Sequence, residues 1–232
     1  MRSAAATRLP LRQLRQCGLH SQPLVVNDRF ALWELRPDAD AAANPSQLLQ
    51  KDRELLAALP APPVARMLLP ADVVGPNISH PFVYVPGSHA RGVEDILAGD
   101  SSSTGYFALS LLPHGSAEQS HVRKPEDLPQ KPAGAIATRL LLSNALVNLW
   151  DFCVEPQRTC ELHEHQHPYV FINRSSGKTR NLDARLQEQG ETQFAAGEFR
   201  YVDVDPTEQR CIHAFQNTGS QALHQYVIEF KN

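Results

Sequence analysis

Between residues 160 and 171, the sequence CELHEHQHPYVF places a histidine at every second position from 163 to 167. In a β-strand, residues i, i+2 and i+4 point to the same face, whereas a helix would spread them around its axis. Five side chains would then share one face: His163, His165, His167, Tyr169 and Phe171. The pattern predicts a strand with three imidazoles in a row. The alternative is a surface strand with a chance run of histidines.

Most other apolar segments are also short and lie between turn residues. Gly, Pro, Ser and Asp separate the runs RFALWELR, ARMLLP, HPFVYVPG and GYFALSLLP, at residues 29–36, 65–70, 80–87 and 105–113. A helix is predicted only for residues 45–59, where leucines recur at roughly 3.6-residue spacing among charged residues. The chain is therefore expected to be an all-β protein with one or two helices.

Length and composition exclude several classes of protein. With 232 residues and 42% hydrophobic content, the chain suits one large β-domain or two smaller ones. Its richest apolar segment, AIATRLLLSNALVNLW, is interrupted by Arg139, whereas a membrane-spanning helix needs about 18 apolar residues in succession. We therefore expect no membrane partner.

The first 26 residues contain four arginines and no acidic residue. This composition is typical of a transit peptide, and a disordered basic tail is the alternative. The sequence thus predicts mitochondrial import, with cytoplasmic or plastid localisation as alternatives. Loss of the four arginines would move the formal net charge from -3 to -7. Such an acidic surface gives no reason to expect a nucleic-acid partner.

The cysteines do not indicate a disulfide framework. Cys17 lies in the basic segment, and the other three, Cys153, Cys160 and Cys211, are odd in number and lack CxxC spacing. By strand alternation Cys211 shares a face with His213, so it is the thiol expected closest to a site built from the histidines. The alternative is a small buried hydrophobic residue.

Two pairs of short segments suggest that the chain contains a duplication. HPFVYVPGSHARG at 80–92 parallels HPYVFINRSSGKT at 167–179, and ALWELRPD at 31–38 parallels NLWDFCVEP at 148–156. The offsets differ, 87 residues for the first pair and 117 for the second, so the first half would need an insertion, which the predicted helix supplies. Two coincidental matches are the alternative.

A family resemblance emerges from the motifs near the C-terminus. His213 is followed at a distance of four residues by Asn217, and then by a Thr-Gly turn before the last strand. HxH in one strand and HxxxN before a terminal hairpin resemble the cupin superfamily (RmlC-like) over residues 145–231. More narrowly, LWDFCVEP, HEHQHPYV, AAGEFRY and HAFQNTG are similar to segments of small bacterial cupins that bear the name beta-alanine degradation proteins.

The resemblance implies a double-stranded β-helix (jelly-roll) barrel in which His163, His165 and His213 bind one divalent metal ion per chain. It also implies a homodimer and, with the duplication, a bicupin whose N-terminal half has lost its histidines. The expected organisation is a transit peptide at 1–26, a degenerate cupin-like half with an inserted helix at 27–112, a proline-rich linker at 113–135 and a metal-binding cupin domain at 136–232.

The sequence departs from the cupin pattern at one ligand. Cupins usually have a glutamate after the second histidine, with three or four residues between, but Tyr169 and Val170 stand at those positions. Three neutral imidazoles suit Fe(II) or Zn first, and also Ni, Mn or Cu, and leave metal positions open. Without a carboxylate ligand, the site would keep a +2 charge and favour a small anionic metabolite as its partner.

We therefore expect a metal-dependent cupin enzyme that acts on a small organic acid or an amino-acid-derived metabolite. An oxygenase is one expected reaction class, and a hydrolase or an isomerase are others. The alternative is a non-catalytic cupin scaffold or sensor that binds a metal or a metabolite, because a fold does not fix a function.

Further side chains are assigned roles around this site. Tyr169 is expected to donate a hydrogen bond to bound substrate, and Glu161 to act as an acceptor or a base, although both could simply pack. Arg158, Arg200 and Arg210 are candidates for carboxylate binding at the mouth, with solvated surface arginines as the alternative. A structural role is expected for three more residues: His167, His224 and Asn217.

Overall fold

The computed structural model describes residues 23–35, 45–59, 61–71, 82–87, 105–114, 132–204 and 211–231. It divides into two compact units, residues 1–115 and 116–232. Within the described residues the regular elements are strands, apart from one helix. The expected all-β class is therefore confirmed.

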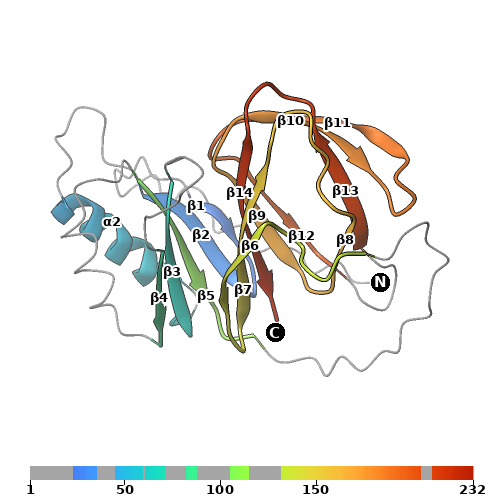
Figure 1. The fold of residues 1–232 in the computed structure, drawn as a ribbon. Coiled ribbons are helices and arrows are strands. Elements are labelled where there is room, and N and C mark those ends of the chain that lie inside the picture. The colour runs from blue at the N-terminus through green and yellow to red at the C-terminus, as the bar shows by residue number, and fades with distance from the viewer. Residues whose placement is uncertain are drawn as a thin grey trace. The chain divides into compact units, whose positions relative to one another are not determined.

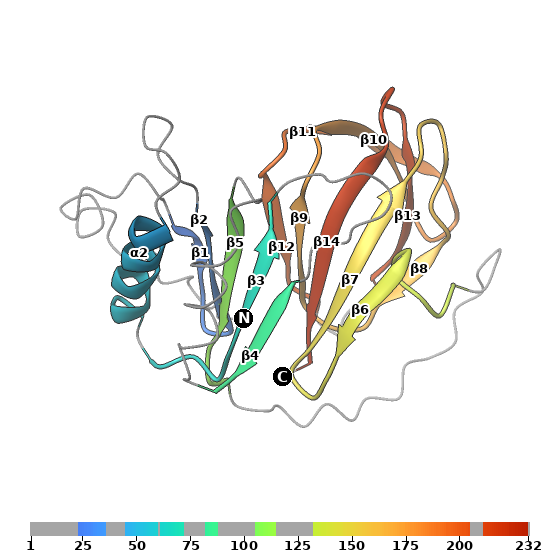
Figure 2. The ribbon, with the colours of Figure 1, turned by 60° about the vertical axis from the view of Figure 1, so that its left-hand side comes forward.

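The N-terminal unit contains one antiparallel sheet with the strand order β1-β2-β5-β3-β4 (Figure 2). Its elements are β1 (Pro23–Val26), β2 (Phe30–Leu35), α2 (Pro45–Ala57), β3 (Ala65–Pro70), β4 (Val83–Pro86) and β5 (Tyr106–Leu111). Helix α2 packs on one face of this sheet, where Leu55 joins a buried cluster with Trp33, Leu68 and Tyr106. The predicted helix and the four predicted strands of this half are all present, within a few residues at each end.

A buried ion pair also joins the helix to the sheet. Arg66 on β3 donates a hydrogen bond through Nη2 to Asp52 of α2, and through Nε to the Ser110 hydroxyl at 3.3 Å. Both charged side chains are almost fully buried. Removing either partner would leave an uncompensated charge beneath the helix.

The C-terminal unit consists of two antiparallel sheets (Figure 1). One has the order β12-β9-β14-β7-β6 and the other β11-β10-β13-β8. Their bounds are β6 (Arg139–Ser143), β7 (Val147–Val154), β8 (His163–His165), β9 (Tyr169–Asn173), β10 (Gly177–Leu182), β11 (Glu188–Phe194), β12 (Phe199–Val202), β13 (Cys211–Asn217) and β14 (Leu223–Phe230). Because the chain alternates between the sheets, this unit is the expected double-stranded β-helix.

An apolar core fills the space between these two sheets. Strands β7, β9 and β14 contribute Phe152, Tyr169 and Val227, and Cys211 and Phe215 of β13 pack against them from the other sheet. The side chains that face this core alternate along each strand, as the pleat of a half-buried strand requires. Residues of the candidate site lie among them.

The expectation of one strand across residues 163–171 is wrong. The chain forms β8 at His163–His165 and β9 at Tyr169–Asn173, and these strands belong to different sheets. Pro168 lies between them, and proline cannot donate a hydrogen bond to a central ladder. Tyr169 nevertheless meets the histidines, because its strand lies on the opposite side of the barrel core.

The two five-stranded sheets share one topology. In chain order their strands are β1, β2, β3, β4, β5 and β6, β7, β9, β12, β14, and both sheets place them in the order first, second, fifth, third, fourth. Trp33 and Trp150 lie on the two second strands, which agrees with a duplication. The His-Pro segments do not correspond, because the first precedes a fourth strand and the second a third strand.

A second barrel is not confirmed. In the part of the chain that the structure describes, the N-terminal unit has a single sheet, and α2 covers the face on which Trp33 lies. Trp150 lies on the barrel side of its own sheet. Helix α2 therefore takes the place that the second sheet has in the C-terminal unit.

Parts of the expected segments fall outside the described residues. These are residues 1–22 of the predicted transit peptide and residues 115–131 of the predicted linker. Residues 23–26 form β1, which pairs with β2, so removal of the whole 1–26 segment would take an edge strand from the N-terminal sheet. Among the described residues, no helix combines the length and apolar character needed to cross a membrane.

Candidate metal centre

Three histidines converge on adjacent strands of the smaller sheet of the C-terminal unit. Strand β13 pairs antiparallel with β8, so that His213 lies directly opposite His163 and Cys211 lies opposite His165. One ligand atom from each of the three histidines lies within 4.8 Å of the other two. Their ring centroids are 4.7 to 5.2 Å apart. The structure thus brings together the three histidines that the sequence selected.

Two of the three imidazoles are held in the neutral form that binds metals. Burial, with the neighbouring His165, lowers the pKa of His163 to about 4. Burial also lowers the pKa of His213 to about 3, together with the other two histidines. Both rings are therefore neutral near pH 7. A neutral imidazole offers one ring nitrogen lone pair to a cation.

The donor set fits a divalent transition metal. Metal-to-nitrogen distances in such sites are about 2.0–2.1 Å, so tetrahedrally arranged ligating nitrogens lie about 3.4 Å apart. Donor atoms within 4.8 Å of one another would move inward on binding one ion. Imidazole nitrogens suit Zn, Fe, Ni and Cu, and the three histidines alone do not discriminate among them.

Glu161 contributes through its backbone. Its carbonyl oxygen lies 2.8 Å from Nδ1 of His163, which fixes the proton on Nδ1 and leaves Nε2 free to bind a metal. The side chain of Glu161 is exposed and lines the edge of a pocket. The acceptor next to His163 is therefore the carbonyl rather than the expected carboxylate.

Tyr169 packs flat against a candidate ligand. Its ring and the His165 ring are 3.7 Å apart between centroids and nearly parallel. Burial raises the pKa of Tyr169, and the Cys211 side chain, to which it is hydrogen-bonded, raises it further. Tyr169 therefore stays protonated, as a hydrogen-bond donor must. Cys211 does approach the site, as strand alternation predicted.

A buried carboxylate, Glu229 on β14, was not found from the sequence. Its Oε1 lies 3.6 Å from Nδ1 of His165, and its Oε2 accepts hydrogen bonds from Asn148 Nδ2 at 3.0 Å and Trp150 Nε1 at 3.1 Å. Burial by itself would raise the pKa of Glu229, but the nearby His165 imidazole and the hydrogen bonds from Asn148 and Trp150 outweigh it and lower that pKa. Glu229 is therefore an anion beside the histidines.

A pocket of about 450 Å³ reaches the site from one side of the barrel. Phe152 and His163 line its inner part, and their rings meet edge to face with centroids 5.9 Å apart. Arg158, Glu155 and Glu161 line its outer part and are exposed. Of the three arginines proposed for carboxylate binding, Arg158 lines this pocket. Arg200 is exposed on β12, and Arg210 lies outside the described residues.

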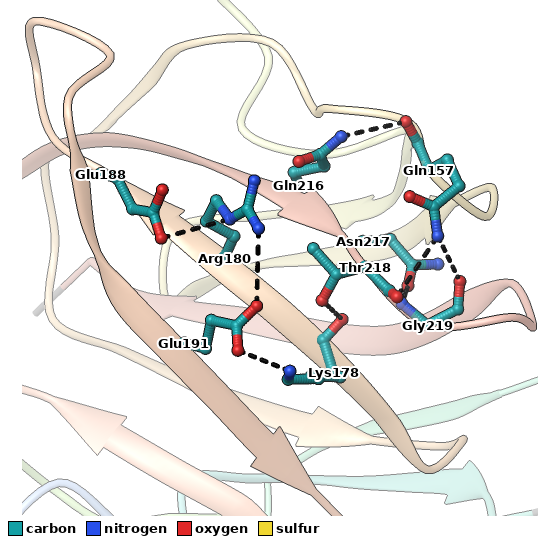
Figure 3. Close-up of polar contacts among 9 residues, drawn as sticks. All are labelled: Gln157, Lys178, Arg180, Glu188, Glu191, Gln216, Asn217, Thr218 and Gly219. Atoms are coloured by element: carbon teal, nitrogen blue, oxygen red, sulfur yellow. Dashed lines mark hydrogen bonds and ion pairs between the residues drawn. The ribbon is translucent and has the colours of Figure 1, made fainter.

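Asn217 fixes the turn after β13, as predicted. Its Nδ2 donates to the carbonyl oxygens of Val154 and Gln221, both at 2.8 Å, and its Oδ1 accepts from the Gly219 N–H at 2.9 Å. Gln157 donates to the Thr218 and Gly219 carbonyl oxygens on the same turn (Figure 3). Of the remaining histidines, His224 is buried and His167 is half-buried.

Comparison with known proteins gave similarity only to solved structures, since no family model and no curated protein matches the chain. A cupin domain from Bordetella pertussis Tohama I is 20% identical, and the match covers 44% of this chain and 99% of that one at a TM-score of 0.35. An RmlC-like cupin family protein with a double-stranded beta-helix fold, from Methanocaldococcus jannaschii, is 13% identical over 50% and 93% of the two chains, with a TM-score of 0.32. A polyketide cyclase from Streptomyces resistomycificus is 15% identical over 48% and 81%, with a TM-score of 0.31.

Proposed function

We propose that the chain is a metal-dependent enzyme that acts on a small organic acid or an amino-acid-derived metabolite. The observation that carries this proposal is the convergence of three histidine side chains on one point of the barrel, two of them buried. Such a cluster is a donor set for a transition metal, because each neutral imidazole offers a ring-nitrogen lone pair to one ion. Three protein ligands also leave metal positions open to substrate, as a catalytic site requires.

The pocket supports the proposed substrate class. Its volume of about 450 Å³ suits a small molecule, and apolar side chains line its inner part beside His163. Arg158 at the outer part offers a guanidinium group that can bind a carboxylate through two parallel hydrogen bonds. Beta-alanine and other short amino and organic acids are the first candidates, because the sequence motifs resemble those of the small bacterial cupins named beta-alanine degradation proteins.

The side chains have distinct roles in this proposal. A bound divalent metal would act as a Lewis acid toward a coordinated oxygen atom of the substrate or of water. The Tyr169 hydroxyl, kept protonated by burial, would donate a hydrogen bond to the substrate. Oxygenase, hydrolase and isomerase chemistry are all compatible with this arrangement, and the loaded metal would narrow the choice.

Metal analysis of the full-length chain tests the proposal. The wild type is expected to carry close to one Fe, Zn, Ni, Mn or Cu per chain, as purified or after reconstitution with Fe(II) or Zn. The His163→Ala, His165→Ala double variant should carry none. His114→Ala is the matched control, because His114 lies in the N-terminal unit beside Asp28. A wild type that takes up no metal after reconstitution would overturn the proposal.

Turnover separates the enzyme from a binding scaffold. The loaded wild type and a His213→Ala variant are incubated with a panel of short amino and organic acids, with and without oxygen, and the products are identified by mass spectrometry. Conversion that is lost in His213→Ala supports the enzyme. Saturable binding of a panel member without conversion would instead identify a metabolite-binding protein.

A further inference from the structure

We propose that Glu229 is the positioning residue of the metal centre, acting through His165. This inference rests on the proposed function and adds to it a carboxylate from a strand outside the HxH motif. Glu229 comes from β14, in the sheet opposite the histidines, and its side chain is about 5% exposed. It does not belong to the group of donor atoms that lie within 4.8 Å of one another. Its role is therefore to orient a ligand.

Each of the two histidines of the HxH motif has an oxygen atom beside its Nδ1. His163 has its Nδ1 against the Glu161 carbonyl oxygen, at 2.8 Å. The Nδ1 of His165 is buried and has no hydrogen bond within 3.5 Å, and the carboxylate of Glu229 lies 3.6 Å away. A closure of a few tenths of an ångström would complete this second bond. Both rings would then carry their proton on Nδ1 and present Nε2 to a metal.

The neighbours of Glu229 determine which way its hydrogen bonds run. Asn148 Nδ2 and Trp150 Nε1 both donate to Oε2, so this oxygen is fully engaged. Only Oε1 remains for His165, and a carboxylate oxygen can only accept. The pair therefore requires His165 to be the donor at Nδ1. Hydrogen bonds to Oε2 fix the carboxylate just as Tyr169 fixes the ring by stacking.

The carboxylate also changes the charge of the site. Three neutral imidazoles around a divalent cation would leave a charge of +2, and an adjacent Glu229 anion reduces the local charge to about +1. A hydrogen bond from a ligating imidazole to a carboxylate also raises the basicity of that imidazole. His165 would thus give its Nε2 electron pair to the metal more strongly than His163, whose Nδ1 faces a neutral carbonyl.

Replacement by glutamine tests the direction of the hydrogen bond. In Glu229→Gln, the two donors Asn148 and Trp150 would draw the amide oxygen to their side, which turns the amide NH2 toward Nδ1 of His165. A donor at that position favours the tautomer with its proton on Nε2, the nitrogen that the metal needs. Glu229→Met removes the carboxylate without presenting a donor. Glu188→Gln makes the same change on the exposed strand β11 and serves as the control.

Two measurements on the full-length protein report the result. Nitrogen NMR of the metal-free protein, with 15N-labelled histidine, should show the His165 proton on Nδ1 in the wild type and on Nε2 in Glu229→Gln. Zinc affinity, measured by competition with a chromophoric chelator, should fall about 10- to 100-fold in Glu229→Gln. The fall should be smaller in Glu229→Met and absent in Glu188→Gln.

The outcomes separate this inference from the function on which it rests. Glu229→Gln with the wild-type tautomer and the wild-type zinc affinity would overturn the inference alone. Equal losses in Glu229→Gln and Glu229→Met would overturn it as well, since the direction of the hydrogen bond would then be irrelevant. A wild type that binds no metal would overturn the proposed function and the inference together.

Discussion

Tyr169 and Glu229 lie directly opposite each other on the paired strands β9 and β14. Together they enclose His165: the tyrosine ring stacks on the imidazole face, and the carboxylate lies 3.6 Å from its Nδ1 edge. In this chain a carboxylate reaches the same histidine from the neighbouring strand, and it meets the side of the ring away from Nε2.

Two substitutions of Tyr169 should distinguish the contribution of its ring from that of its hydroxyl group. Tyr169→Phe keeps the stack on His165, so we expect unchanged metal content and a loss of about 1 kcal/mol in the free energy of unfolding, from one buried hydrogen bond. Tyr169→Ala leaves a cavity and should lose about 3–5 kcal/mol, together with zinc affinity, because the imidazole is no longer held. Urea unfolding and chelator competition measure the two effects. Loss of zinc binding in Tyr169→Phe would contradict this account.

Asn217 should be important for stability, although it lies outside the candidate metal centre. Its side chain makes three hydrogen bonds, to the Val154 and Gln221 carbonyl oxygens and from the Gly219 N–H. Asn217→Ala removes all three hydrogen bonds, one of them buried, so we expect a loss of about 2–4 kcal/mol in the free energy of unfolding. Urea unfolding of Asn217→Ala is compared with Gln216→Ala on the same strand. Similar midpoints for the two variants would refute the assigned role.

Strand alternation, a local property, predicted that His163 and His165 share a face, whereas the resemblance to cupins pointed to His213 as the third ligand. His163 and His165 are two residues apart on β8, and the spacing of His213 and Asn217 agrees with the strand and turn at the end of β13. The chain leaves β8 before Pro168, so Tyr169 belongs to the opposite sheet, but its side chain still points into the core. The interpretation of a single strand was wrong, yet the set of inward side chains was nearly right.

Glu229 could not be found in the same way. All eight residues of β14 are buried, so apolar alternation along this strand does not distinguish its two faces. From His224 onward, strand alternation places the apolar Tyr226 and Ile228 on one face. Glu229 then falls on the opposite face, which the sequence gives no reason to assign to the core. Its partners Asn148 and Trp150 are about 80 residues away in sequence. Only the pairing of β7 with β14 brings them together, and strand pairing is not encoded locally.

The N-terminal unit offers a test of the buried ion pair between Asp52 and Arg66. Asp52→Ala leaves the Arg66 guanidinium buried without a counter-charge, and we expect a loss of about 3–5 kcal/mol in the free energy of unfolding. The Asp52→Leu, Arg66→Met double variant replaces both charges by apolar groups and should be clearly more stable than Asp52→Ala. Chemical denaturation of the three proteins measures this order. A double variant as unstable as the single one would show that the pair itself stabilises the unit.

Acid should destabilise the metal-free protein in a defined pH range. The pKa of His163 in the folded chain is about 4 and that of His213 about 3, whereas both are about 6.5 in the unfolded chain. Below about pH 6.5 the unfolded chain therefore binds protons that the folded chain does not. The free energy of unfolding should fall as the pH drops from about 6.5 to about 4, by up to about 1.4 kcal/mol per pH unit for each histidine.

The contribution of these two histidines can be isolated by replacing both with asparagine, which does not titrate. The free energy of unfolding is measured by urea titration, with a chelator present, at half-unit steps from pH 7.5 to 4.5. The His163→Asn, His213→Asn variant should show a shallower decline than the wild type, and the two curves should converge in slope above about pH 7, where both histidines are neutral in either state. Equal slopes throughout would mean that the two imidazoles titrate in the folded chain as they do in the unfolded chain, which would contradict a folded state that holds His163 and His213 neutral at mildly acidic pH.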